Sequence, residues 1–283
     1  MAISKLRDIV EQCYEGGKNW VASFRKVPAI ASTATGVVDF SMSPGNPRAN
    51  FYTGDALAAT LLNTNYGIWH GGNVSPATKV LRKISFMVPP ATITPIELYA
   101  LDYLMFYPLI DMDSTDEQVL DNTTISLPRY TNGDGVRAFL VATNPYVGGA
   151  QFTMTYINQN GVRKTTRLQT TNTHTYIGTI VHSGATAGVS GTFINTPDGD
   201  GIRYVESITF MSPNGGLAAL VLCKVLTVVS TINAAPTQAE WDCLLQKGEL
   251  PVIQDGAYLN FIGQVNGSAA AVVLSGTIET IWN

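Results

Sequence analysis

The segment 152–168 constrains the fold more than any other part of this sequence, because it predicts a β-hairpin with a defined register. In its first arm Phe152, Met154 and Tyr156 alternate with threonines, which places the apolar residues on one face of a strand. We expect a three-residue loop that ends with left-handed Gly161, as in a type I turn followed by a G1 bulge. A two-residue Asn-Gly turn would mix the two faces, so burial of a single face favours the longer loop. The expected pairs are Phe152 with Leu168, Met154 with Thr166, Asn158 with Val162, Thr153 with Arg167 and Thr155 with Thr165.

Most of the chain from Thr123 to Val229 also has a sequence pattern typical of β-strands separated by turns. Glycine-rich turn signals, such as Asn132-Gly133-Asp134-Gly135, separate short runs of β-branched and aromatic residues. This spacing predicts a mainly β fold, an antiparallel β-sandwich or jelly roll with a few short helices. The expected strands are 123–128, 136–143, the two hairpin arms, 175–181, 191–195, 204–211, 217–229, a final hairpin of 258–264 with 270–282, and a short candidate at 36–40.

Four short helices are expected around this β domain. The first begins at Ser4 and ends at Gly16-Gly17, and the second begins at Asp55 and carries Leu57, Leu61 and Leu62. Thr94-Pro95-Ile96-Glu97 combines a capping box with proline at the first helical position, so 95–107 is predicted to be a buried helix. Thr237 and Glu240 form another capping box, which predicts a helix that stops at Gly248.

The N-terminal region 1–47 is expected to be distinct from the β-rich domain 48–283. After the first helix, the sequence from Trp20 to Pro47 is irregular and rich in proline and glycine. A helix followed by an extended segment could be an arm that docks on a neighbouring subunit. It could equally fold back on its own domain, and the sequence leaves both alternatives open.

The surface is expected to carry few charges. Charged residues make up 13% of the chain, about half of the roughly 25% that is usual in soluble domains. Little long-range repulsion then opposes contact between copies. The net charge of −4 argues against electrostatic binding of nucleic acid, which needs clustered Lys and Arg. The nearest basic cluster, Arg163, Lys164 and Arg167, is interpreted as a solvated strand face.

The three histidines and the acidic residues give no catalytic or metal-binding motif. His70, His174 and His182 are not at zinc spacing with one another or with cysteine. We expect His70 to serve in packing or in a contact between subunits, and His174 to be a surface residue.

Two acidic clusters have some features of a calcium loop and of a glycosidase carboxylate pair. The run from Asp111 through Asp113 to Asp116 and Glu117 resembles the start of a calcium loop, but it lacks the required glycine and final glutamate. A solvated loop is therefore expected, with a weak cation site around Asp111–Asp116 as the alternative. Asp198 and Asp200 lie in one glycine-rich turn, where they rarely reach the separation a glycosidase pair needs.

Cysteine content and hydropathy bound the remaining possibilities. Cys13, Cys223 and Cys243 form an odd, widely spaced set, which is typical of small buried residues in a reducing compartment. No signal peptide is predicted, because residues 1–10 carry Lys5, Arg7 and Asp8 in place of an apolar core. No transmembrane helix is predicted, because the most apolar stretch, 96–110, is too short and contains two acidic residues.

Several segments spread along the chain carry a further signal as a set. They are GNPRANFYTGDAL, IWHGGNVSPATKVLR, LDYLMFYPLIDMD with DEQVLDN, LPRYTNGDGVR, YINQNGVR, GDGIRYVESITF with SPNGG, and LPVIQDGAYLNFI. Together they resemble a class of tailed-bacteriophage virion structural proteins, over most of residues 45–262. The resemblance implies a β-rich particle component without enzymatic activity, and it carries over no catalytic residue.

The resulting hypothesis is a non-enzymatic capsid decoration or cement subunit that oligomerises and stabilises the shell. Its expected partners are copies of itself and other virion proteins such as the major capsid protein, with no cofactor, metal, nucleic acid or membrane. Its expected location is the virion, assembled in the host cytoplasm. The alternatives are a tail, baseplate or neck protein, a carbohydrate-binding receptor-recognition module that uses Trp69, Tyr130, Tyr146 or Tyr176, and a glycosidase or esterase on a β scaffold.

Overall fold

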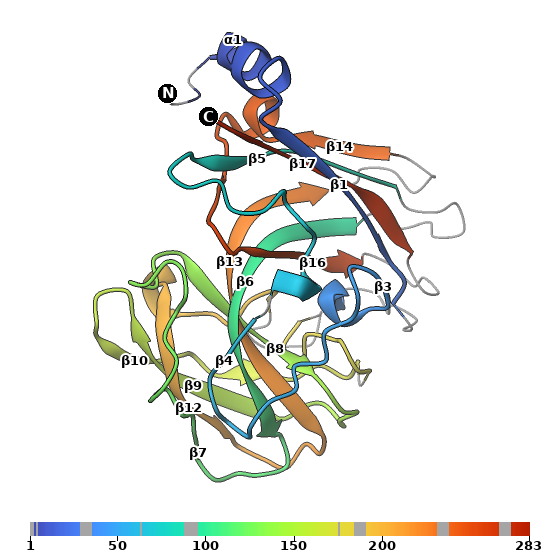
Figure 1. The fold of residues 1–283 in the computed structure, drawn as a ribbon. Helices are drawn as coiled ribbons and strands as arrows, with labels where there is room; N and C mark the ends of the chain where they lie inside the picture. The colour runs from blue at the N-terminus through green and yellow to red at the C-terminus, as the bar shows by residue number, and fades with distance from the viewer. Residues whose placement is uncertain are drawn as a thin grey trace.

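The structure is a computed structural model that describes residues 3, 5–28, 36–62, 64–87, 96–174, 176–183, 191–230, 238–265 and 273–283. In these residues the strands form three sheets, and all the ladders between them are antiparallel (Figure 1). The predicted antiparallel β-sandwich class is therefore confirmed. The strands are β1 (Asn19–Lys26), β2 (Val37–Asp39), β3 (Gly45–Asn46), β4 (Thr60–Leu61), β5 (Lys79–Met87), β6 (Ile96–Asp111), β7 (Gln118–Val119), β8 (Val136–Ala142), β9 (Gln151–Asn158), β10 (Arg163–Thr165), β11 (Gln169–Thr170), β12 (Ile202–Phe210), β13 (Leu217–Ser230), β14 (Gln238–Asp242), β15 (Val252–Ile253), β16 (Tyr258–Val265) and β17 (Leu274–Trp282).

One long sheet organises the molecule. This central sheet has the order β2-β16-β6-β13-β8, and β4 also pairs with β6. The long strands β6 and β13 run from the upper to the lower half of the molecule (Figure 1). The upper sheet is β14-β5-β17-β1-β3 with β15 on β5, and the lower sheet is β10-β9-β12-β7 with β11 on β9.

The upper sheet and the lower sheet each pack against β6 and β13, and the two apolar cores that result are separate. Leu98 and Ala100 of β6 belong to the core shared with the upper sheet, which includes Phe24 and Ile278. Farther along β6, Leu104 belongs to the core shared with the lower sheet. The fold is therefore two sandwiches that share one central sheet.

A buried ion pair lies between the two cores. Asp102 of β6, between Ala100 and Leu104, is 1% exposed. Arg129 donates to it twice, from Nε at 2.9 Å and from Nη2 at 2.7 Å, and the Tyr258 backbone N–H donates at 3.1 Å. Burial raises the pKa of the Asp102 carboxyl, and the adjacent guanidinium opposes that shift. The boundary between the cores is thus polar and hydrogen-bonded.

The opposite face of the central sheet is covered by a third core, to which Val37, Tyr52 and Ile180 contribute. Asp39 lies fully buried at its edge. The Ser41 N–H and the Tyr103 hydroxyl donate to its Oδ1, both at 2.8 Å, and the Tyr52 hydroxyl donates to Oδ2 at 2.5 Å. These donors compensate part of the cost of removing a carboxylate from water.

The predicted helix over 95–107 is wrong, because β6 begins at Ile96 and runs as a strand to Asp111. Thr94 and Pro95, which carried the capping argument, lie outside the described residues. Leu98, Leu101 and Leu104 are all fully buried, on both faces of the sheet. The sequence of a strand that is covered on both faces is a continuous apolar run. Hydrophobic periodicity cannot distinguish such a run from a buried helix.

The two helices predicted near Asp55 and Thr237 are also corrected. The first is a turn followed by the short strand β4, which pairs with β6. In the second region, β14 pairs with β5, and a single π-helical turn, Cys243–Lys247, follows β14. Asp242 caps that turn by accepting from the Leu245 N–H at 3.0 Å, and left-handed Gly248 ends it as predicted. Thr237 lies outside the described residues.

The hairpin at 152–168 is confirmed around its turn and corrected at its end. Thr155 is opposite Thr165, and Gly161 is left-handed with φ 74°. Beyond them Phe152 is opposite Gln169 and not Leu168. The Thr166 side chain, in place of a backbone carbonyl, accepts the Met154 N–H at 3.0 Å. That substitution ends the regular ladder and shifts the register by one residue.

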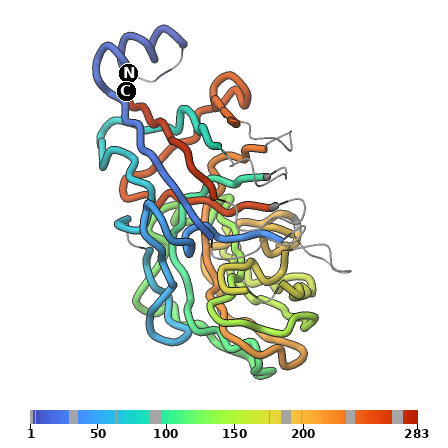
Figure 2. Tube along the Cα trace, turned by 90° about the vertical axis from the view of Figure 1, so that its right-hand side faces the viewer, coloured from blue at the N-terminus to red at the C-terminus, as the bar shows by residue number. Residues whose placement is uncertain are grey.

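The N-terminal region packs on the rest of the chain. The helix comprises α1 (Leu6–Asp8) and a π-helical continuation, Ile9–Tyr14, and it projects from one end of the molecule (Figure 2). Ile9 and Cys13 pack against Val80 and Ile281, and β1 pairs with β17 along its full length. Of the two alternatives, a docking arm or a segment that folds back on its own domain, the described residues show the second. The division at residue 47 stays a prediction, and Ser4 lies outside the described residues.

The other expected strands divide into two groups. Those at 136–143, 204–211, 217–229 and 258–264, the Leu274–Trp282 arm of the last hairpin and the short candidate at 36–40 are confirmed. The segments 123–128 and 191–195 form no strand, and the described part of 175–181 contributes only isolated bridges at Thr179 and Ile180.

Candidate functional site

The histidines that the sequence offered are structural. His70 is 3% exposed, and its Nε2 lies 3.2 Å from the Ala257 carbonyl oxygen. The buried Lys79 ammonium donates to the His70 carbonyl oxygen at 2.8 Å, and burial lowers the pKa of His70 to about 4. His182 is fully buried and accepts the Leu140 N–H, while His174 is half-buried. His70 therefore serves in packing within the chain, one of the two roles expected for it.

The acidic residues around Asp111 hold turns together. Asp111 Oδ1 accepts the Asp113 N–H at 2.9 Å, and Asp113 Oδ1 accepts the Gly215 N–H at 3.1 Å. Glu117 accepts from the Ser207 hydroxyl at 2.6 Å. Within the described residues, no three His, Cys, Asp or Glu side chains are grouped as a metal site requires. The arrangement is that of a hydrogen-bonded loop.

The Asp198–Asp200 turn and the basic cluster meet each other. Residues Pro197–Gly199 form a single 3-10 turn, after which Asp200 accepts from Asn158 Nδ2 at 2.9 Å and pairs with Lys164 at 3.1 Å. Arg163 pairs with Glu206 at 2.5 Å. Arg163 thus joins the first hairpin to β12, and Lys164 joins it to the turn that precedes β12. Cys13, Cys223 and Cys243 are all buried free thiols, which confirms the burial expected for Cys223 and Cys243.

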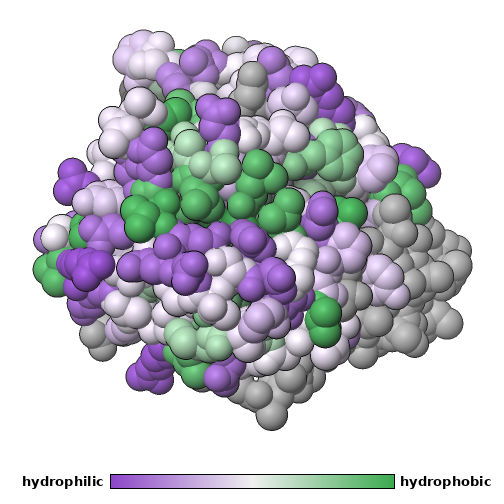
Figure 3. All heavy atoms as spheres, turned by 90° about the horizontal axis from the view of Figure 1, so that it is seen from below, coloured by the Kyte–Doolittle hydropathy of each residue, from purple (hydrophilic) through white to green (hydrophobic). Residues whose placement is uncertain are grey.

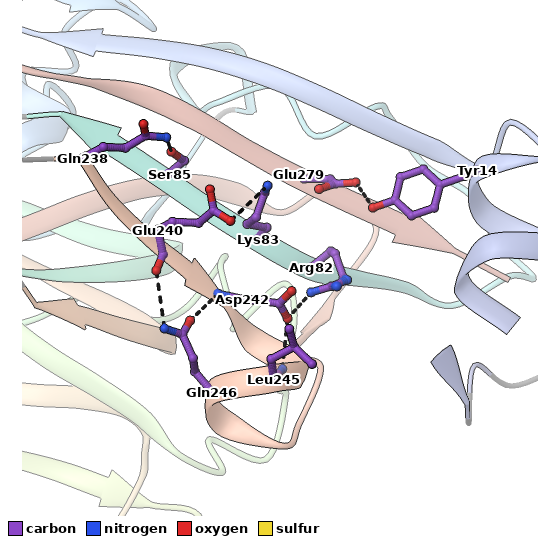
Figure 4. Close-up of polar contacts among 10 residues, drawn as sticks. All are labelled: Tyr14, Arg82, Lys83, Ser85, Gln238, Glu240, Asp242, Leu245, Gln246 and Glu279. Atoms are coloured by element: carbon purple, nitrogen blue, oxygen red, sulfur yellow. Dashed lines mark hydrogen bonds and ion pairs between the residues drawn. The ribbon is translucent and has the colours of Figure 1, made fainter. Parts of the chain in front are cut away.

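The outer face of the upper sheet carries a set of polar contacts between strands (Figure 4). Lys83 of β5 pairs with Glu240 of β14 at 3.5 Å. Arg82, beside the β-bulge between β5 and β17, pairs with Asp242 at the end of β14. The Tyr14 hydroxyl of the helix donates to Glu279 of β17, and burial together with that carboxylate raises the pKa of Tyr14 to about 12. These contacts fasten β14 and the helix to the sheet within one chain.

Three connections are bonded together at the lower end of the molecule, near β7 (Figure 1). Asn214 is 1% exposed and links them. Its N–H donates to the Met112 carbonyl oxygen at 3.0 Å, its carbonyl oxygen accepts the Val147 N–H at 2.8 Å, and its side chain accepts the Gly148 N–H at 2.7 Å. Met112 in turn donates to the Gly216 carbonyl oxygen at 3.2 Å. The three connections are therefore cross-linked by backbone and side-chain hydrogen bonds.

The lower end nevertheless exposes large apolar side chains. Val147 is 73% exposed, Val119 68%, Met211 52% and Leu109 43%. Seen from below, apolar residues form a band across this end (Figure 3). Leu109 also has φ 56°, a left-handed conformation that costs an L-residue about 1–2 kcal/mol. We name the exposed side chains Leu109, Val119, Val147 and Met211 the lower apolar surface.

The aromatic residues proposed for sugar binding fall into different environments. Trp69 is 55% exposed and Tyr176 48%, whereas Tyr146 is buried and Tyr130 half-buried. Trp20, which sequence reasoning missed, is 42% exposed, and its indole N–H donates to the Trp69 carbonyl oxygen at 3.1 Å. Its position at the start of an irregular segment gave no sign that β1 would place it beside Trp69.

No helix in the described part of the chain is both long and apolar enough to cross a membrane. No family model and no curated protein matches this sequence. Among solved structures, the chain is similar to the VP2 subviral particle of infectious bursal disease virus, with 9% identity, 94% of this chain and 81% of that chain covered, and a TM-score of 0.18. It is also similar to T=1 particles derived from infectious bursal virus, with 10% identity, coverage of 94% and 78%, and a TM-score of 0.19. At such scores these likenesses carry no argument about what this chain does.

Proposed function

We propose that this chain is a non-enzymatic virion structural protein that associates with copies of itself through the lower apolar surface. That surface is the observation on which the proposal rests. Large exposed apolar side chains at one end of a protein are typical of interaction sites, and the connections that carry Val147 and Met211 are hydrogen-bonded through Asn214 and Gln151. A rigid surface loses little conformational entropy on binding.

The more specific form of the proposal is a capsid decoration or cement subunit of a tailed phage. It draws on the sequence resemblance and on the low charge of the chain, which permits dense packing of copies. The partners would be sister subunits and the major capsid protein, in a virion assembled in the host cytoplasm. A tail, baseplate or neck position is the alternative within the same class.

The test compares valine-to-threonine variants at the two ends of the molecule. Val119→Thr with Val147→Thr alters the lower apolar surface, and Val21→Thr alters a similarly exposed valine, 58% accessible, on β1. We expect sedimentation equilibrium to show association of the wild type and of Val21→Thr, weakened about tenfold or more in the lower-end variant. Because apolar burial drives the contact, added salt should change it little. A wild-type protein that stays monomeric up to its solubility limit would contradict the proposal.

The copy number per particle distinguishes the possible locations in the virion. Quantitative mass spectrometry of particles purified from cells that carry the gene measures it. Hundreds of copies per particle support a shell or tail-tube protein, and a few dozen or fewer support the neck, vertex or baseplate. Absence from the particles contradicts the virion assignment.

A second candidate, recognition of neutral glycans, is favoured by the adjacent exposed indoles of Trp20 and Trp69. Aromatic rings can stack on the apolar faces of sugars, and a large exposed ring is otherwise costly in water. Glycan-array binding that is lost in both Trp20→Ala and Trp69→Ala would support this candidate. An array without any bound glycan would rule it out.

A further inference from the structure

A cavity of about 610 Å³ opens at the β8 edge of the central sheet. Tyr99 of β6, Val225 of β13 and Arg137 of β8 line it, together with residues 192–195. Strand register explains this arrangement. Arg137 is opposite Cys223, and Cys223 is opposite Tyr103. Since alternate residues share a face, Arg137 lies on the face that bears Tyr103 and Phe139. The lining residues are Tyr99, Gly135, Arg137, Gly191, Thr192, Phe193, Ile194, Asn195, Lys224 and Val225.

The cavity is positively charged, in a protein that is negative overall. Arg137 and Lys224 line it, and no carboxylate is among its lining residues, although the chain has 21 acidic and 17 basic residues. Glu97 contacts one lining residue, since the Tyr99 hydroxyl donates to it at 2.8 Å, but Glu97 itself does not line the cavity. The local charge therefore favours an anion.

Arg137 differs from the paired arginines of the chain. Within the described residues its guanidinium makes no hydrogen bond or ion pair, whereas Arg129 and Arg163 each bind a carboxylate. Arg137 is only partly exposed, and a ligand that reaches it meets a guanidinium that no carboxylate of the described residues already binds. Lys224 is partly engaged, because it donates to the Asp134 carbonyl oxygen at 2.8 Å and lies 5.3 Å from the centre of the Tyr130 ring.

We propose that this cavity binds a carboxylate-bearing ligand, specifically an acidic sugar, with Arg137 as the residue that binds the carboxylate. A guanidinium matches a carboxylate through two parallel hydrogen bonds. Phe193 and Tyr99, whose ring centres are 5.6 Å apart, supply an aromatic wall against which a sugar ring can pack. Lys224 also lines the cavity and adds positive charge. This inference is independent of the proposed assembly through the lower apolar surface.

The experiment measures binding of glucuronic acid and N-acetylneuraminic acid by calorimetry, with glucose as the neutral control and inorganic phosphate as a second anion. Arg137→Met removes the charge, Arg137→Lys keeps it without the two-pronged geometry, and Arg203→Met removes an exposed arginine that does not line the cavity. Thermal unfolding of each variant verifies that it is folded.

We expect saturable binding of at least one acidic sugar by the wild type and Arg203→Met, and none of glucose. Arg137→Met should weaken that binding about 10- to 100-fold, and Arg137→Lys should fall between. Equal affinity in Arg137→Met, or no binding of either acidic sugar, would overturn the proposal. Binding of phosphate alone would also overturn it, because it would assign the cavity to a different class of anion.

Discussion

Lys26 shows what a single buried charge does to this protein. Its ammonium group is fully buried at the end of β1 and donates to the carbonyl oxygens of Ser43 at 3.2 Å and Pro47 at 2.7 Å. Removal from water lowers the pKa of Lys26 to about 8 from 10.5, while nearby Asp39 partly opposes the shift. Between these two pH values the unfolded chain holds a proton that the folded chain has released.

The free energy of unfolding should therefore rise with pH across that window. We predict that the wild type gains stability relative to Lys26→Met between about pH 8 and 10.5, by up to about 1.4 kcal/mol per pH unit. Below about pH 8 the difference between the two proteins should be constant, because Lys26 is then protonated in both states. Urea unfolding at several pH values measures it. A difference that does not vary between pH 8 and 10.5 would refute the assignment.

Two adjacent glycines in the β12–β13 connection provide a matched comparison. Gly215 and Gly216 both have positive φ, 63° and 76°. A Cβ on Gly215 would meet nothing within 4 Å, whereas one on Gly216 would lie 2.3 Å from the Pro145 carbonyl oxygen. We predict that Gly215→Ala costs about 1 kcal/mol for its backbone conformation alone. Gly216→Ala should cost at least about 2 kcal/mol more, because the chain at Pro145 must move. Equal losses in denaturant unfolding would show that contact at Pro145 is unimportant.

At the scale of elements, the N-terminal helix is held by one face. Ile9 is 3% exposed, whereas neighbouring Val10 is 50% exposed. We predict that Ile9→Ala destabilises the protein by about 2–4 kcal/mol, and that Val10→Ala changes stability by less than about 0.5 kcal/mol. Deleting residues 2–16 should leave the β-sheet circular dichroism intact, because β1 begins only at Asn19. Loss of the β signal on this deletion would mean that the helix is needed for folding.

At the scale of the whole molecule, β6 and β13 join the two sandwiches. Each strand contributes residues to both the upper and the lower core, so neither core can open without breaking a strand that the other needs. We predict a single cooperative unfolding transition. Scanning calorimetry should give equal calorimetric and van't Hoff enthalpies. Two separated transitions would show that the shared sheet does not couple the cores.

The sequence by itself determined what local chemistry controls. Period-2 alternation and turn glycines placed the hairpin at 152–168, the strands at 136–143 and 258–264, and the end of the π-helical turn at Gly248, because these signals act between neighbouring residues. The class of fold followed from them. His70 was also correctly expected to be a packing residue, and Cys223 and Cys243 to be small buried residues.

Only the tertiary structure decided the rest. Residues 96–111 are a strand because both faces of the central sheet are covered, and that burial erases the alternation on which sequence reasoning relies. Trp20 meets Trp69, and Leu109 joins Val147 and Met211 at one end, through pairings between distant segments. The cationic cavity at Arg137 likewise depends on a register across three strands. Such neighbours are set by the free energy of packing the whole chain, which no local pattern contains.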